Sequence, residues 1–549
     1  MSGVDHAVPA NDWTVLDGLV ADPAPLVSVI VVHYEQPADL ARTLHALGRQ
    51  SYDAALVEVI VVDDGSAHPP AVPEGVRLVV QPDRGFRVAA ARNAGAALAR
   101  GEVLCFLDAD TSPEPGYVEA LTRLPALCSD VVTVGRRRHA EFAASAGAGA
   151  SAAAARDDAA AGDAAAAGER VEPGEPVEIA GPRAELTEPQ WLREAYARSR
   201  DLLEADQRSY RFVISAVLAC SRRIFELTGG FDESFDAYGG EDWEWADRAW
   251  RLGAVFAHVP EAVAWHAGPD LAERSADRDE LVRRKNAEAL VLLDRIAVVP
   301  ARRDRGLLSA AVDVVVEVPS GSAAASVVCA DVVLAALPAA RVLIDDDHAA
   351  RLAGDARVLG RHSAAAEAAR TSARVVVRAS HLFTVPRDAR PAFADQLTTA
   401  TEQVGTGTLG WRELVTAHPA DAAVDDSATD MAADPADTAV DNPGTDAAAD
   451  SSDAPGAPAA DMTADPADAA PGDSVDAPGD FADTVADDAP TDPTASAPAL
   501  VIEVAAARAE HRRARRPDAH GFVRDRQPCA ASALLHEPDL EAHLAGWGG

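Results

Sequence analysis

The sequence predicts an α/β fold in which a parallel, doubly wound sheet carries helices on both faces. Three observations support this. Four short apolar runs lie within residues 27–107, and the first is continuous rather than alternating, as in strands buried on both faces. Helical spacing lies between the first and second runs and between the third and fourth. Acidic residues follow two of the runs, at the sheet edge where such proteins bind ligands.

The predicted elements alternate along the chain. We expect strands at 27–32, 57–62, 76–80 and 102–107, and helices at 38–49 and 87–100. In the first helix, Leu40, Leu44 and Leu47 fall on one side, which is typical of a helix packed against a sheet. Strands that alternate with helices indicate parallel pairing.

The length of 549 residues favours more than one domain, and composition marks the boundaries. We expect a polar, flexible leader at 1–25, a first domain at 26–300 with a low-complexity insertion at about 143–183, a second α/β region at 310–418, an acidic Asp/Pro/Ala tract at 419–498 and a C-terminal segment at 499–549. Such a tract cannot bury a core. The C-terminal segment is expected to rejoin the second region across it.

The second region repeats the order of the first. We expect strands at 312–318, 341–347 and 373–380 and a helix at 324–336. The second of these strands again ends in acids, but Ser380, His381 and Leu382 follow the last one. This order indicates a degenerate internal repeat.

Charge and cysteine content exclude some classes of function. The formal net charge is −39, and residues 421–500 hold 20 Asp with no Glu, Lys or Arg. This balance argues against nucleic-acid binding, which requires a basic face. The five cysteines are widely spaced and form no CxxC pair, so we expect reduced thiols in a cytoplasmic protein.

The stretch FLDADT places Asp108 and Asp110 directly after a predicted strand. Residues i and i+2 of an extended chain point the same way, so the two carboxylates repel unless a cation lies between them. Oxygen ligands suit Mg²⁺ or Mn²⁺. A solvated acidic turn is the alternative. FLDADT also resembles the nucleophile motif of haloacid-dehalogenase-like phosphatases, although their chemistry needs a lysine and Lys285 lies far downstream.

Two further groups surround this edge. Asp63 and Asp64 begin DDGS after the second strand, where a carboxylate can accept a uracil N–H or bind a ribose hydroxyl; an Asx-type turn is the alternative. Arg84, Arg87 and Arg92 place guanidinium groups near the same edge and could offset a diphosphate, unless they form a solvated helix face.

These motifs, in this order, resemble the family 2 glycosyltransferases of the GT-A fold. The resemblance runs through VSVIVVHYEQP, IVVDDGS, GFRVAAARNAG, FLDADTSPEP, LTGGFDESFDAYGGEDWEWADRAWRLG and VPEAVAWHAG. It covers about residues 26–270 less the insertion, and its second half is similar to the galactosyltransferase C-terminal type, with GGEDWE as its motif. HYEQP replaces the family's usual Pro and Tyr-Asn pair, and ISAVLACSRR replaces an Asn-containing turn.

The resemblance implies a GT-A fold, a Rossmann-like mixed sheet, and a role for each matching residue. The nucleotide-sugar would be bound by Tyr34, Asp63, Asp64, Arg84, Arg92 and Asp108. A divalent cation, Mn²⁺ or Mg²⁺, would be bound by Asp108, Asp110 and His266. Asp242, with Glu241 before it, would be the catalytic base, and Gly239, Gly240 and Trp245 would face the acceptor. From spacing alone, Glu241 and Asp242 also fit the acidic first turn of an ordinary helix, and His266 a structural histidine.

The expected function is therefore sugar transfer from a nucleotide-diphosphate donor, a UDP-sugar, to a hydroxyl of a glycan or lipid-linked acceptor. Direct attack would invert the anomeric centre. The alternatives are a phosphatase that uses FLDADT, and a scaffold protein whose C-terminal half binds a protein partner. We expect the setting to be cell-surface polysaccharide synthesis, with peripheral association at the inner face of the membrane through the acceptor.

Overall fold

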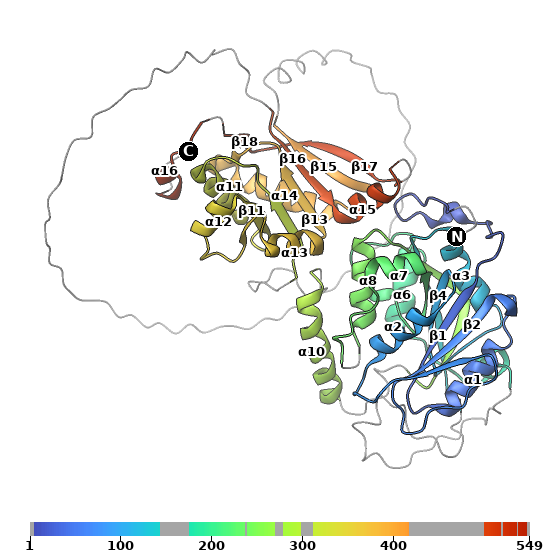
Figure 1. Cartoon of the computed structure of the whole chain (residues 1–549). Coiled ribbons are helices and arrows are strands. Elements are labelled where there is room, and N and C mark those ends of the chain that lie inside the picture. Colours follow the sequence, from blue (N-terminus) through green and yellow to red (C-terminus); the bar gives the residue numbers. More distant parts are fainter. Residues whose placement is uncertain are drawn as a thin grey trace, which may run out of the picture. The chain divides into compact units, whose positions relative to one another are not determined.

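The computed structural model describes residues 5–142, 175–236, 239–269, 278–297, 311–416, 499–517, 520–534 and 536–545. The chain divides into two units, Met1–Ala417 with Pro498–Gly549, and His418–Ala497. The second unit contains nearly all of the acidic tract and lies outside the described residues, as do residues 143–174 of the expected insertion. The first unit contains two large sheets with helices packed on them (Figure 1).

The first sheet contains nine strands among the described residues, in the order β3-β2-β1-β4-β8-β6-β9-β5, with β7 beside β6. Its strands are β1 (Val27–His33), β2 (Val57–Asp63), β3 (Arg77–Val80), β4 (Val103–Asp108), β5 (Thr111–Pro113), β6 (Val131–Ala140), β7 (Glu185–Leu186), β8 (Val217–Ser221) and β9 (Val255–Ala267). β1 to β4 pair in parallel, whereas β8 runs antiparallel to both neighbours. The sheet is therefore mixed, and the predicted α/β fold of the GT-A type is confirmed.

The helices of the first region follow the predicted alternation. They are α1 (Pro37–Leu47), α2 (Val88–Leu98), α3 (Tyr117–Leu127), α5 (Val177–Arg183), α6 (Gln190–Ser199), α7 (Arg222–Thr228), α8 (Glu241–Arg251) and α10 (Arg278–Arg295). Local chemistry sets their ends. Pro37 opens α1, where its missing N–H is no loss. The Ser221 hydroxyl caps α7, which ends at Gly229 in the left-handed region.

Two segments expected to be flexible carry buried side chains. In the predicted leader, Val8 and Leu16 are at most 1% exposed and pack where α3 ends and β9 begins. In the predicted insertion, residues 177–183 form α5, whose Val177 and Ala180 pack against Trp265. Both segments are short and polar on average, so their few apolar contacts, made with distant strands, leave no periodic signal in the sequence.

The second sheet contains seven strands among the described residues, in the order β12-β11-β10-β13-β16-β15-β17. They are β10 (Val314–Glu317), β11 (Arg341–Ile344), β12 (Val358–Gly360), β13 (Val375–Ala379), β15 (Leu409–Val415), β16 (Val501–Ala506) and β17 (Val523–Pro528), and β14 (Phe383–Thr384) pairs separately with β18 (Ser532–Ala533). The helices are α11 (Ala323–Ala336), α12 (Asp346–Arg351), α13 (Ala364–Ser372), α14 (Arg390–Gln403), α15 (Ala507–Arg515) and α16 (Leu540–Ala545).

The two sheets share one strand order. If the short β5 and β7 are set aside, each has its strands, numbered along the chain, in the order 3-2-1-4-6-5-7, with only the sixth antiparallel to its neighbours. Residues 501–528, which follow the acidic tract, supply β16 and β17 and so complete the sheet that begins before it.

Asp108 and Asp110, which follow β4 in the first sheet, have no acidic counterpart at the matching positions of the second. When Asp345 after β11 is matched to Asp63 of β2, the strand registers place Ala379 where the first sheet has Asp108, and His381 where it has Asp110.

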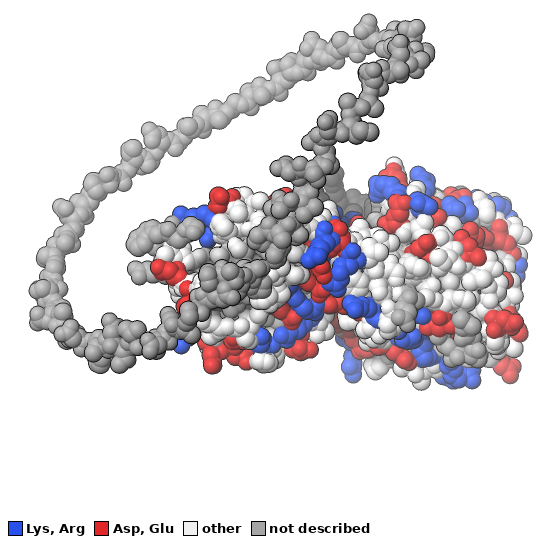
Figure 2. Space-filling view, turned by 90° about the horizontal axis from the view of Figure 1, so that it is seen from above, with Lys and Arg blue, Asp and Glu red and all other residues white. Residues whose placement is uncertain are grey.

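Basic and acidic side chains intermingle on the surface seen in Figure 2. Among the described helices, none has both the length and the apolar character to cross a membrane.

Candidate active site

The carboxyl ends of β1 and β2 are joined by a buried polar cluster. Their parallel register pairs His33 with Asp63, and the two side chains meet at 2.7 Å between Nδ1 and Oδ1. Asp63 also accepts hydrogen bonds from the backbone N–H and the hydroxyl of Ser66, at 3.0 and 2.6 Å. Burial alone would raise the pKa of Asp63, but the hydrogen bonds from His33 and Ser66 outweigh it and lower that pKa. Asp63 is fully buried, so it holds this loop in place rather than contacting a nucleotide directly.

Asp64 ties a second loop to the same edge. Its Oδ1 accepts a hydrogen bond from Gln81 at 2.5 Å and its Oδ2 one from the Arg87 backbone at 2.9 Å. A Cβ on the next residue, Gly65 (φ +85°), would lie 2.4 Å from the Asp83 backbone, so only glycine allows this approach. The loop that Asp64 secures carries the exposed Arg84.

Arg92 of α2 is the centre of the site. Its guanidinium donates to Asp108 at 2.8 Å and to Glu241 at 2.9 Å, and it lies over the Phe231 ring. Arg92 is 2% exposed. Burial alone would lower its pKa, but the charges of Asp108 and Glu241 raise it, so Arg92 stays cationic. The end of β4 and the start of α8 are therefore joined through one buried cation.

Asp110 and His266 approach each other because of strand pairing. β5 and β9 are antiparallel, with Thr111 opposite His266, and this places Asp110 Oδ2 3.5 Å from His266 Nε2. The Nδ1 of His266 lies 3.3 Å from the Gly268 carbonyl, which assigns the proton to Nδ1 and the lone pair to Nε2. Gln36 Nε2 also donates to Asp110 Oδ2, at 3.4 Å. Sequence reasoning missed Gln36, because it has no acidic or metal-binding signature.

These two side chains fit one end of a divalent-cation site. An imidazole lone pair and a carboxylate oxygen converge, and Mg²⁺ or Mn²⁺ commonly takes its other ligands from substrate phosphates and water. Asp108, the third expected ligand, has Oδ1 bound to Arg92. Within the described ranges, no group of three or more His, Cys, Asp or Glu side chains is arranged to hold a metal. Of the three predicted ligands, Asp110 and His266 are therefore the two that the structure brings together.

Glu241 and Asp242 begin α8 after two left-handed glycines. Gly239 and Gly240 have φ of +96° and +94°, and a Cβ on Gly240 would press on Phe235 and Leu292. Asp242 accepts hydrogen bonds from the backbone N–H of Trp243 at 2.8 Å and of Ser215 at 3.5 Å. Burial, and then the charge of Glu241, raise the pKa of Asp242 to about 7. A carboxylate with this pKa can accept a proton near neutral pH.

Trp245 does not face an acceptor. It is fully buried, donates its indole N–H to the Thr228 hydroxyl at 2.9 Å, and packs on Phe231. The prediction that Trp245 stacks on a sugar is wrong, because residues i and i+4 share one face of a helix and Glu241 already points into the protein toward Arg92. The half-buried Trp243, edge-on to Tyr210, lies beside Asp242 in the chain instead.

The comparisons with known proteins match the region that holds this site. Residues 28–143 match the family model described as glycosyl transferase family 2, and residues 201–264 match the one described as N-terminal domain of galactosyltransferase. The chain carries a family 2 glycosyltransferase domain. FLDADT lies within the first match, which supports its interpretation as part of a transferase site over that as a phosphatase nucleophile.

Curated relatives align with about half of the chain. The chain is 28% identical over 260 residues to the hyaluronan synthase of Pasteurella multocida, covering 46% of this chain and 26% of that protein. The chondroitin synthase of Escherichia coli is 27% identical over 273 residues, covering 48% of this chain and 37% of that protein. The chain thus spans well under half the length of these relatives.

Solved structures with some similarity include two glycosyltransferases. One is GalNAc-T7 with UDP, GalNAc and Mn²⁺, at 17% identity and a TM-score of 0.30, covering 46% of this chain and 44% of that one. The other is the mannosyltransferase PcManGT of Pyrobaculum calidifontis with GDP-Man and Mn²⁺, at 19% identity and a TM-score of 0.32, covering 52% and 68%.

We predict that Arg92→Met lowers the free energy of unfolding by roughly 3–5 kcal/mol, because it leaves Asp108 and Glu241 without their shared cation. Denaturant unfolding measures the change. The control is Arg84→Met on the exposed loop, for which a change within about 0.5 kcal/mol is expected. A stability of Arg92→Met equal to that of the unchanged protein would contradict the buried ion cluster.

Proposed function

We propose that the chain transfers a sugar from a nucleotide-diphosphate donor to a hydroxyl of a glycan or lipid-linked acceptor, with Asp242 as the catalytic base. The observation that carries this proposal is the buried Arg92 guanidinium, which Asp108 and Glu241 share. Arg92 binds both Asp108 and Glu241, and so joins the strand end that leads to Asp110 with the helix start that carries Asp242. A cation-binding carboxylate and a proton acceptor at one strand edge are the two groups that the reaction requires.

The donor side of the site is the strand edge formed by β1, β2 and β4. Asp110 and His266 would hold a divalent cation, which neutralises the diphosphate and makes it a better leaving group. Asp64 and Tyr34 would face the nucleotide, and the exposed Arg84 would approach the phosphates. We propose a UDP-sugar as donor, because a carboxylate after β2 can accept the uracil N–H.

The acceptor side is the start of α8. The acceptor hydroxyl would hydrogen-bond to a carboxylate oxygen of Asp242, which takes the proton as the new C–O bond forms and the bond to the diphosphate breaks. One displacement of this kind inverts the anomeric centre. The left-handed backbone of Gly239 and Gly240 would present the start of α8 to the acceptor, and Trp243 would contact it. Hyaluronan and chondroitin, which the relatives are named for making, are glycans, and this supports a glycan acceptor.

We also propose a cytoplasmic setting, at the inner face of the membrane if the acceptor is lipid-linked. All five cysteines are free, and four of them are buried. Free thiols fit a reducing compartment.

Replacing Asp242 with Asn tests the base. We expect Asp242→Asn to lower kcat by roughly 10²–10⁴-fold, because the amide cannot accept the proton. The affinity for the nucleotide should change little, since Asp242 is not part of the donor side. Transfer assays and nucleotide titration measure the two quantities, with the exposed Glu226→Gln as control. Near-normal transfer by Asp242→Asn would refute the assignment.

The pH dependence of the reaction follows from the raised pKa of Asp242. A base works only when deprotonated, so kcat/KM should be constant above pH about 7 and fall about tenfold for each pH unit below it. The profile of initial rates between pH about 5.5 and 8.5 measures this. A flat profile down to pH about 5.5 would show that Asp242 is not the base.

Removing divalent cations should abolish transfer, and Mn²⁺ or Mg²⁺ should restore it. We expect His266→Ala to raise the cation concentration needed for half-maximal rate by at least about tenfold, because one of two protein ligands is lost. Cation titrations of the rate, and of nucleotide binding, give the comparison, with the exposed His45→Ala of α1 as control. Full activity in a chelator would rule out the cation site.

A further inference from the structure

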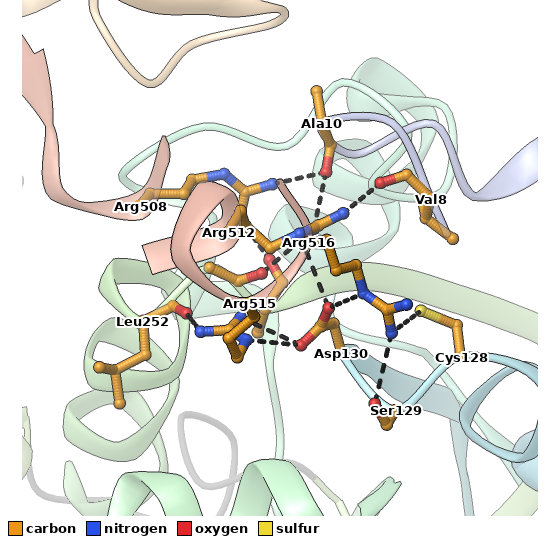
Figure 3. A network of polar contacts seen from close by, with 12 residues as sticks. Val8, Ala10, Cys128, Ser129, Asp130, Leu252, Arg508, Arg512, Arg515 and Arg516 are labelled. Carbon is orange, nitrogen blue, oxygen red and sulfur yellow. Dashed lines mark hydrogen bonds and ion pairs between the residues drawn. The ribbon is translucent and has the colours of Figure 1, made fainter. Parts of the chain in front are cut away.

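Helix α15 of the second sheet region places its arginines against the C-terminal end of α8. Figure 3 shows Arg508, Arg512 and Arg515 from one side of this short helix. Arg515 Nη1 donates to the Leu252 carbonyl at 2.7 Å, Arg512 Nη1 to the Gly253 carbonyl at 3.2 Å, and Arg508 Nη1 to the Ala254 carbonyl. Three consecutive carbonyls that follow α8 are thus each bound by a different arginine.

We propose that Arg508, Arg512 and Arg515 are positioning residues for the catalytic base, because they fix one end of the helix that carries Asp242 at the other. This inference rests on the proposed function of Asp242.

The three carbonyls belong to the residues that connect α8 to β9, directly after the last turn of the helix. Buried carbonyl oxygens need hydrogen-bond donors, and the arginines supply them here. Gly253 allows the close approach: its φ is +89°, and a Cβ there would lie 2.5 Å from Arg512. The Arg508 guanidinium also lies 3.5 Å from the centre of the Trp250 ring. The end of α8 therefore fits α15 through hydrogen bonds, charge and stacking together.

The arginines of α15 that bind these carbonyls are largely buried, so their guanidinium groups need hydrogen-bond partners within the protein. Arg508 and Arg512 are 3% and 0% exposed, and burial first, then neighbouring arginine charges, lower the pKa of each. Asp130 pairs with Arg515 at 3.0 Å and with Arg516 at 2.8 Å, and lies 3.7 Å from Arg512. Asp5 also pairs with Arg516, at 2.8 Å, and the guanidinium groups of Arg508, Arg512 and Arg515 donate to backbone carbonyl oxygens, those of residues 252–254 and of Val8 and Ala10 (Figure 3).

The other end of α8 is fixed by a different arginine. Arg92 holds Glu241 in the first turn, so buried arginines bind α8 at both ends. The helix has eleven residues, which makes it roughly 16 Å long. Over this length a tilt of about 5° displaces the far end by roughly 1.4 Å. A misplacement of about 1 Å can cost roughly 10²-fold in rate. The coupling is one of position, since the helix-end charge acts only within the nearest turn.

The test compares arginines of α15 that differ in whether they touch α8. Arg515→Ala and Arg512→Ala remove donors to the carbonyls of Leu252 and Gly253. The matched control is Arg513→Ala, because Arg513 lies in the same helix but is exposed, over the Trp411 ring. We expect kcat to fall at least about tenfold for the first two, with the KM for the donor and the pH midpoint of Asp242 unchanged. Arg515→Lys, which keeps a cation beside Leu252 and Asp130, should recover part of kcat. Arg513→Ala should keep normal kcat.

A second measurement does not depend on activity. Hydrogen exchange of the Glu244 amide, which bonds to the Gly240 carbonyl at 3.0 Å in the first turn of α8, should accelerate in Arg515→Ala and not in Arg513→Ala. If Arg512→Ala does not fold, Arg515→Ala decides the question. Normal kcat and normal exchange in a folded Arg515→Ala protein would overturn the positioning role. Absence of transfer by the unchanged protein with any donor would instead refute the proposed function, while the exchange result would still show whether α15 holds α8.

Discussion

The buried guanidinium of Arg92 organises the whole candidate site. One acidic pair lies where β4 ends and another where α8 begins, and buried like charges repel one another. Arg92 pairs with Asp108 from the first and with Glu241 from the second, and so joins the two elements. Asp110 and Asp242 are the acids that the proposed reaction uses. The same interaction explains why a pair of adjacent acids opens α8: Glu241 supports the structure, and its charge helps to raise the pKa of Asp242.

Much of the first sheet could be predicted from the sequence because its signals are local. Continuous apolar runs gave β1, β2 and β4, and the acids after β2 and β4 indicated the functional edge. The role of each acid could not be predicted, since it depends on partners across the sheet. Asp63 and Asp64 look alike in DDGS, but Asp63 lies opposite His33 and its carboxylate is taken up by hydrogen bonds to His33 and Ser66. Trp245 was misassigned because spacing shows which residues share a face, not which face is buried.

The arginines of α15 show even more clearly that the role of a side chain cannot be predicted from the sequence when its partners are distant. In the sequence, RAEHRRARR suggests a solvated basic helix, yet the side chain of Arg512 is inaccessible to solvent. Its partners are backbone carbonyls more than two hundred residues earlier, and carbonyls carry no signal in the sequence. The second sheet lacks acids at the positions of Asp108 and Asp110, and it contacts the chain after α8 through the arginines of α15.

The place of β16 has a consequence for how the protein is made. β16 lies between β13 and β15, so this sheet is open in the middle until the ribosome has passed the acidic tract and released residues 501–506. α15 follows β16 at once. The sheet is therefore completed only when α15 can also contact α8, and a nascent chain that stalls within the tract contains Asp110 and Asp242 but not the helix whose arginines bind the chain after α8.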